Sequence, residues 1–265
     1  LVTGGSRGLG REMALALKEG GADVMISGRS DGDAFRGTAA ELASAGPGRS
    51  AHHAADVGDP AACEKLVAAT IAAFGRIDVL VNNAGLGMRR ISETFTTRPT
   101  RFWETEPEDW RAIIETNLNG AFYMARAATR HMVGQGRGKI LNISTSAPTM
   151  VRPGYSPYGP GKAALEAASR VWAQDLAGTG VTVNVYLPGG ASDTDLIPGG
   201  AGRRGADGQL LPADIMRRGI VWLASTRSDH VTGGRYTARL WDPSLPPDEA
   251  AAGARSAPCD VPAIL

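Results

Sequence analysis

Short apolar runs alternate with longer segments of helical periodicity along most of the chain. Apolar runs bounded by turn residues are typical of buried parallel strands, and their alternation with helices is typical of βαβ units. We predict strands at 1–3, 23–27, 51–56, 79–81, 139–143, 182–187 and 235–240. We predict helices at 10–19, 60–74, 107–133, 157–177 and 212–224. This order predicts an α/β fold with helices on both faces of a parallel sheet, in a single domain over 1–241.

Two internal segments interrupt this rhythm. The connection 86–106 is roughly ten residues longer than we expect, and it leaves the carboxyl end of a strand, where ligands bind in such sheets. Its arginines and aromatic side chains indicate either a wall for an anionic or polar substrate or a solvated surface insertion. These residues are Arg89, Arg90, Arg98, Arg101, Phe95, Phe102 and Trp103. The segment 189–211 is rich in Gly, Arg and Asp, and we predict that it is a mobile lid.

The two ends of the chain also depart from the pattern. Leu1-Val2-Thr3 has the character of the last part of a strand, and we expect the leading part of that strand to be missing. The tail 242–265 is rich in Pro and Ala and carries no periodic pattern, so we predict an arm or a loose terminus there.

The charge and the cysteines argue against several classes of function. The net charge is +1 with no long run of one sign, which argues against a nucleic-acid or membrane-surface partner. No apolar stretch approaches the roughly 18 residues of a membrane span. Cys63 and Cys259 are far apart, and neither they nor the four histidines have metal-ligand spacing, so we expect no metal site. This cysteine usage suits a reducing cytoplasm.

Thr3-Gly4-Gly5-Ser6-Arg7-Gly8-Leu9-Gly10 lies between the first predicted strand and the first predicted helix. Glycines at 4, 8 and 10 would permit a tight turn, close backbone approach to a pyrophosphate, and close packing of the helix on the sheet. The start of the helix would then face the phosphates. A glycine cluster alone is also compatible with an ordinary turn, but this position predicts a Rossmann-type doubly wound sheet that binds a dinucleotide.

The residues after the second predicted strand favour NADP(H) over NAD(H). An NAD site usually has an acid about 20 residues after the glycines, which holds the ribose hydroxyls. This chain has Ser27-Gly28-Arg29-Ser30 in that region, and the first acid is Asp31. Arg29 could pair with the 2′-phosphate of NADP, and Arg7 could approach the same group. Either arginine taken alone would be an ordinary solvated charge.

Tyr158-Gly159-Pro160-Gly161-Lys162 is the sharpest chemical signal in the sequence. Residues four apart on a helix lie on one face, so Tyr158 and Lys162 can meet. A nearby ammonium group would lower the pKa of a phenol toward the working range of a general acid. The same spacing also arises by chance around surface tyrosines.

Together these motifs resemble the short single-domain branch of the short-chain dehydrogenases/reductases over nearly the whole chain. The resemblance rests on the TGxxxGxG turn, Asn82-Asn83-Ala84-Gly85, Asn117, the YxxxK helix and Pro188-Gly189, in that order. It implies that Asn117 holds a water that links Lys162 to solvent, and that Lys162 binds the nicotinamide ribose. The predicted cofactor-binding residues are Gly4, Ser6, Arg7, Gly8, Leu9, Gly10, Arg29, Asp56, Val57, Asn83, Ala84, Gly85, Lys162, Pro188, Gly189 and Thr194.

Two positions depart from the family pattern. The serine that orients the substrate in the family is replaced by Thr145, with Ser144 and Ser146 on either side. Thr145 can donate the same hydrogen bond, or a shift of one residue brings Ser146 into the site. Gly161 stands where a small polar residue is usual, and it should loosen the start of the helix by about 1 kcal/mol.

The predicted catalytic residues are Tyr158, Lys162, Asn117, Thr145 and Ser146. We expect hydride transfer between NADP(H) and a carbonyl or secondary alcohol, with Tyr158 as the general acid/base. The alternatives are an NADP-binding regulatory protein without turnover and an enoyl reductase, although the Tyr–Lys spacing argues against the latter. The resemblance also implies a cytoplasmic homotetramer, or a homodimer, that acts on a small molecule.

Overall fold

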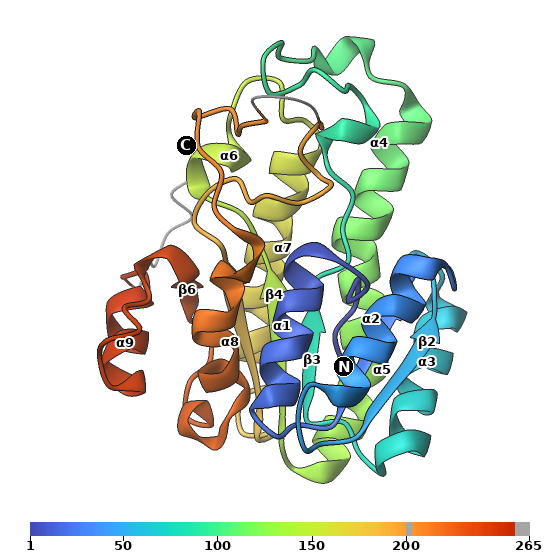
Figure 1. Ribbon diagram of the computed structural model, residues 1–265, viewed down its shortest axis with the longest axis vertical. Coiled ribbons are helices and arrows are strands. Elements are labelled where there is room, and N and C mark those ends of the chain that lie inside the picture. Colours follow the sequence, from blue (N-terminus) through green and yellow to red (C-terminus); the bar gives the residue numbers. More distant parts are fainter. Residues whose placement is uncertain (200–202, 258–265) are drawn as a thin grey trace.

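The computed structural model describes residues 1–199 and 203–257, and a parallel sheet lies at its centre (Figure 1). β1 (Val24–Gly28) pairs with β2 (Ser50–Ala54). The remaining strands pair in chain order: β3 (Val79–Asn82), β4 (Gly138–Ile143), β5 (Val181–Leu187) and β6 (Arg235–Thr237). Val2 joins the two parts, because its backbone bridges Ile26 on one side and Val81 on the other. The segment 1–3, which was predicted as a strand, therefore lies in the middle of the sheet, between β1 and β3.

Helices cover both faces of the sheet. One layer contains α1 (Gly8–Glu19), α2 (Asp33–Ser44) and α8 (Arg217–Ala224). The other contains α3 (Pro60–Phe74), α5 (Gly120–Gln135) and α7 (Tyr158–Asp175). Successive strand residues point to opposite layers, so Ile26 belongs to the first core while Met25 belongs to the second. The predicted doubly wound α/β fold is confirmed.

The helix predicted over 107–133 is divided. It consists of α4 (Pro107–Ile114), one π-helical turn at Glu115–Asn119, and α5. Single π turns inside helices are frequent at functional sites, and this one contains Asn117. The short helix α6 (Ala147–Met150) precedes α7 and lies at the same end of the molecule as α4 (Figure 1).

Among the described residues, three α-helices lie outside the predicted helices, namely α6 and the two helices that follow. α2 buries only Phe35, Thr38 and Leu42, so its apolar signal is weak. α9 (Pro247–Ala254) lies within the predicted tail, and its buried residues are alanines, Ala250, Ala251 and Ala254. It packs against α8 and β6. The expectation of an arm or loose terminus from residue 242 is therefore corrected for 242–257, while 258–265 lie outside the described residues.

The segment 189–211, described except for 200–202, is tied to its surroundings. A backbone bridge joins Ser192 to Leu211, and an ion pair of 3.2 Å joins Arg203 to Asp193. Whether this segment moves as a lid stays a prediction.

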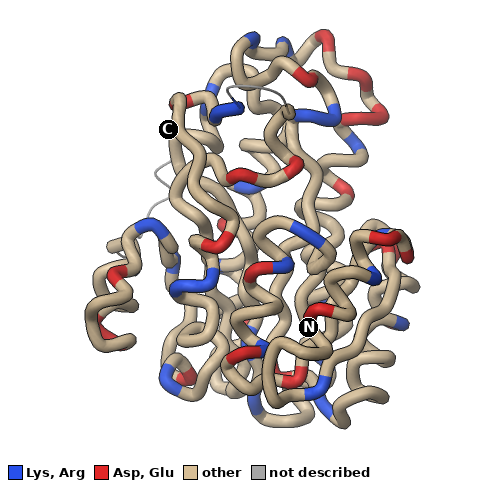
Figure 2. The backbone as a smooth tube through the Cα atoms, in the orientation of Figure 1, with Lys and Arg blue, Asp and Glu red and all other residues tan. Residues whose placement is uncertain are grey.

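Charged residues of both signs are spread over the molecule (Figure 2). Within 1–199 and 203–257, no group of three or more His, Cys, Asp or Glu side chains is placed to hold a metal ion. No helix in those ranges has the length and apolar character needed to cross a membrane.

Candidate active site

The glycine turn brings the start of α1 close to the end of the central strand segment. A Cβ atom on Gly10 would lie 2.2 Å from the carbonyl oxygen of Gly4, so only glycine fits there. Gly8 begins α1 with a φ of +54°. Asn83 fixes the turn, because its Nδ2 donates to the carbonyls of Thr3 (2.9 Å) and Gly4 (3.0 Å). No described side chain caps the first turn of α1, which leaves its N–H groups able to bind an anion.

The end of β1 carries an unpaired cation next to an acid that has an exposed ion-pair partner. Arg29 is exposed, and no hydrogen bond or ion pair joins it to any described residue. Asp31 pairs with Arg36 at 3.2 Å. Arg7 pairs with Asp195 at 3.0 Å, but both side chains are more than half exposed, so this pair is weak and exchangeable.

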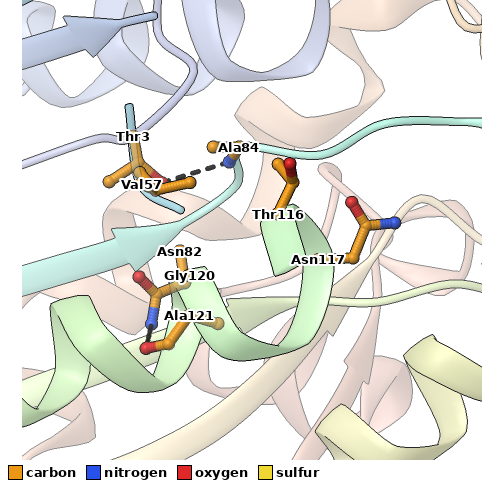
Figure 3. A pocket seen from close by; sticks show the side chains of 8 residues that line it. All are labelled: Thr3, Val57, Asn82, Ala84, Thr116, Asn117, Gly120 and Ala121. Atoms are coloured by element: carbon orange, nitrogen blue, oxygen red, sulfur yellow. Dashed lines mark hydrogen bonds between the residues drawn. The ribbon is translucent and has the colours of Figure 1, made fainter. Parts of the chain in front are cut away.

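A small hollow lies beside the carboxyl end of β3 (Figure 3). The Thr3 hydroxyl organises its edge by accepting hydrogen bonds from the backbone N–H groups of Asn83 (3.0 Å) and Ala84 (3.1 Å). Asn82 donates to the carbonyl of Ala121, but its Oδ1 is buried without a partner. The lining residues are Thr3, Val57, Asn82, Ala84, Thr116, Asn117, Gly120 and Ala121.

Thr145, not Ser146, faces the tyrosine. The side chain of Thr145 forms a hydrogen bond with Tyr158, whereas the hydroxyl of Ser146 lies 2.9 Å from that of Thr149. Ser144 is buried, and its hydroxyl has no hydrogen-bond partner in the described chain. This geometry favours Thr145 over Ser146 as the hydroxyl that orients the substrate.

Burial sets the pKa values of the Tyr158 and Lys162 pair. Burial raises the pKa of Tyr158 to about 12, against a smaller lowering by the Thr145 hydrogen bond. Burial lowers the pKa of Lys162 to about 8, against the opposing charge of Glu166. Lys162 Nζ donates to the carbonyl of Ile143 at 2.7 Å. The expectation that Lys162 lowers the pKa of Tyr158 is not met, because loss of water outweighs every other influence on the phenol.

Asn117 has a different contact from the expected water. Its Nδ2 donates to the carbonyl of Leu86 at 2.8 Å, and its Oδ1 accepts from the N–H of Leu86 at 2.7 Å. Both polar atoms of the side chain therefore bind the backbone that enters the segment 86–106. The expected binding of a water by Asn117 stays a prediction.

The segment 86–106 presents an apolar face to the site. Met88 and Phe95 are buried with Ile197, and Tyr155 and Tyr158 pack against this cluster. Its predicted anion-binding arginines point elsewhere: Arg89 pairs with Glu93 at 2.9 Å and Arg90 pairs with Asp109 at 2.9 Å. Because both arginines already have carboxylate partners, the structure gives no support to the hypothesis that they bind an anionic substrate, and it stays a prediction.

Arg235 of β6 forms hydrogen bonds with three other segments of the chain, one of which contains Thr145. Its Nε donates to Glu166 at 2.9 Å, and its guanidinium donates to the carbonyl of Thr145 at 3.0 Å and to the hydroxyl of Ser256. Sequence reasoning missed this group, since Glu166 lies four residues after Lys162 but Arg235 is distant in sequence.

The carboxyl end of the sheet fits a nicotinamide dinucleotide. The glycine at position 10 lets the Gly4 turn pack closely on α1, and the uncapped start of α1 offers N–H groups to a ligand phosphate. Thr194 lies over the glycine turn, where its Cγ2 is 3.1 Å from the place of a Cβ on Gly8. This arrangement defines a doubly wound dinucleotide-binding fold with a Tyr–Lys site at the carboxyl end of its strands.

Comparison with known proteins agrees with this class. The family model for short chain dehydrogenases matches residues 1–198. A 3-oxoacyl-[acyl-carrier-protein] reductase of Escherichia coli K12 is 33% identical over 240 residues, 88% of this chain and 92% of that protein. Gluconate 5-dehydrogenase of Gluconobacter oxydans is 36% identical over 71% of this chain and 69% of its own. A dehydrogenase/reductase from Sinorhizobium meliloti 1021 superposes with a TM-score of 0.76 at 31% identity, covering 89% of this chain and 91% of that structure.

The chain belongs to the short-chain dehydrogenase/reductase family. It is an oxidoreductase that acts on a CH–OH/C=O pair, and its family uses NAD(P) cofactors and small-molecule substrates.

Proposed function

We propose that this protein is an NADP(H)-dependent carbonyl reductase in which Tyr158 is the general acid. The observation that carries the proposal is the hydrogen bond between Thr145 and Tyr158, with Lys162 one helical turn further along α7. The nicotinamide, when bound, supplies or accepts the hydride. All other steps fall to side chains of this chain.

The raised pKa of Tyr158 favours the reductive direction. A phenol whose pKa is about 12 stays protonated at neutral pH, so it can donate its proton to a carbonyl oxygen as negative charge develops there. The Thr145 hydroxyl donates a second hydrogen bond to the same oxygen and stabilises it. Lys162, with a pKa of about 8, can return a proton to the phenolate. In the reverse reaction the same groups act in the opposite order.

The preference for NADP(H) rests on the charges near the end of β1. Arg29 is a free cation among the described residues, Asp31 is held by Arg36, and Arg7 has only an exposed partner. A dianionic 2′-phosphate would gain from Arg29 and Arg7, whereas a ribose hydroxyl would not.

We propose further that the protein is a cytoplasmic homotetramer, or a homodimer. Apolar side chains on the outer faces of α5 and α7 support association, because Phe122 is 44% exposed and Val171 is 53% exposed. The thiol of Cys63 is buried and unpaired, which suits a reducing compartment.

Replacing Arg29 tests the cofactor assignment. We expect Arg29→Ala to raise the KM for NADPH by about 10-fold to 100-fold, since one charge-assisted pair is lost, and to leave the KM for NADH unchanged. Steady-state NAD(P)H oxidation with a panel of ketones, aldehydes and 3-oxoacyl thioesters measures both constants. Arg98→Ala is the control, because Arg98 is an exposed arginine of the segment 86–106. An equal effect on NADH and NADPH would contradict the assignment.

A further inference from the structure

Arg152 is a partly buried cation that lies six residues before Tyr158, between α6 and α7. Its guanidinium carbon lies 5.5 Å from the centroid of the Tyr155 ring. Its Nε is buried, and no described residue accepts a hydrogen bond from it. A charged donor withdrawn from water without an acceptor costs free energy. A ligand that supplied an acceptor would remove that cost.

Four other arginines of the chain differ from Arg152 in having carboxylate partners. Arg89 pairs with Glu93, and Arg90 pairs with Asp109. Arg203 pairs with Asp193, and Arg235 pairs with Glu166. No ion pair within 4.0 Å joins Arg152 to any residue in the described part of the chain.

Tyr155 connects Arg152 to the reacting site. The Tyr155 ring contacts the Phe95 ring edge to face, with 5.5 Å between centroids. Tyr155 and Tyr158 pack against the apolar cluster of Met88, Phe95 and Ile197. Tyr155 thus contacts both the Arg152 guanidinium and the apolar cluster against which Tyr158 packs, and its ring is the apolar wall of this region.

We propose that Arg152 binds the carboxylate of an oxo acid whose carbonyl lies at Tyr158 and whose carbon chain lies along the ring of Tyr155. This proposal rests on the proposed carbonyl reductase function and names its substrate class. A planar guanidinium matches a carboxylate with two parallel hydrogen bonds. The apolar wall matches the methylene groups that separate the two ends of such a substrate.

The surrounding charge favours a single negative charge on the ligand. Asp207 lies close enough to Tyr155 to act on the pKa of its phenol, which burial raises most and which Arg152 lowers. The carboxylate of Asp207 reduces the positive potential around Arg152. A monoanionic carboxylate therefore fits better than a dianionic phosphate ester.

The test compares charged and neutral substrates of the same shape. Oxo acids with one, two or three methylene groups between carbonyl and carboxylate are paired with their methyl esters, and kcat/KM with NADPH is measured for each. We expect Arg152→Gln to lower kcat/KM for the best oxo acid by about 10-fold to 100-fold, and to leave that of its ester unchanged. Arg152→Lys should recover part of the loss because it keeps the charge. Arg76→Gln, at an exposed arginine before the start of β3, should change neither.

A binding measurement completes the test. Calorimetry of pentanoate and hexanoate with the NADPH-loaded protein should give a dissociation constant that Arg152→Gln raises by about 10-fold or more. Equal kinetics of acid and ester in both proteins, or binding that does not depend on Arg152, would overturn the proposal while leaving ketone reduction intact. Failure of the proposed function itself would look different, because neither the acids nor the esters would then be reduced.

Discussion

At the residue scale, Tyr158 and Lys162 show how burial prepares a site before any ligand arrives. Loss of water favours the neutral form of each group, so the pKa of the phenol rises and the pKa of the ammonium falls. The hydrogen bond from Lys162 to the carbonyl of Ile143 holds the ammonium in place. A neutral phenol beside an amine that titrates near neutral pH is a suitable pair for proton delivery and return.

The lowered pKa of Lys162 makes a prediction for stability. Between the folded pKa of about 8 and the ordinary value near 10.4, the unfolded chain binds more protons at this position than the folded chain. The free energy of unfolding therefore rises with pH in this window. Relative to Lys162→Met, we expect wild type to gain about 2 kcal/mol between pH 7 and pH 9.5, measured by urea unfolding.

The pH window ends at 9.5 so that the ionisation of Tyr158 contributes little to the free energy of unfolding. Its raised pKa acts with the opposite sign, because the folded chain binds more protons there above about pH 10. A wild-type curve parallel to that of Lys162→Met up to pH 9.5 would show that the ammonium is not desolvated.

At the element scale, β6 supports the catalytic residues from behind through Arg235. This side chain binds Glu166 of α7 and the carbonyl of Thr145, which follows β4. Glu166 acts on Lys162, because its charge raises the pKa of that ammonium. Arg235 is thus a positioning residue that couples one strand to both sides of the site.

Removal of Arg235 should change the catalytic rate and its pH dependence together. We expect Arg235→Met to lower kcat by roughly 10-fold to 100-fold because Thr145 loses its support. The KM for NADPH should stay unchanged. Glu166 would lose its partner and raise the pKa of Lys162 further, so the pH profile of kcat should shift upward.

Two further variants distinguish this role from simple destabilisation. Arg235→Met combined with Glu166→Gln should return the pH profile toward that of wild type. Arg126→Met removes an exposed ion pair between α5 and α3, which involves none of the residues that Arg235 binds, and should change nothing. An unshifted pH profile in Arg235→Met would argue against the coupling.

Elements with a strong apolar signal were predictable, and those without one were not. The helix predicted over 60–74 is preceded by Asp59, a capping residue, and has Pro60 in its first turn. The structure has α3 at the same bounds. α9 buries alanines, which carry little hydrophobic contrast. The π turn at Glu115–Asn119 keeps the helical pattern on both sides, so periodicity cannot locate it.

At the scale of the whole molecule, motifs predicted which residues meet but not which polar groups remain unpaired. Thr145 acts on the Tyr158 phenol, and Lys162 lies one helical turn after Tyr158 on α7, as the spacing indicated. The apolar face of 86–106 and the unpaired Arg152 depend on contacts between segments far apart in the chain. Arginine content alone suggested Arg89 and Arg90, because a sequence does not show which cations already have carboxylate partners.

The most direct test of the account is the effect of Tyr158→Phe on NADPH-dependent ketone reduction. The variant removes one hydroxyl group and keeps the buried ring that packs against the cluster of Met88, Phe95 and Ile197. We predict that kcat falls by roughly 100-fold to 10,000-fold, the usual contribution of a general acid, while the dissociation constant for NADPH is unchanged. Turnover by Tyr158→Phe at the wild-type rate would contradict the assignment of Tyr158 as the proton donor.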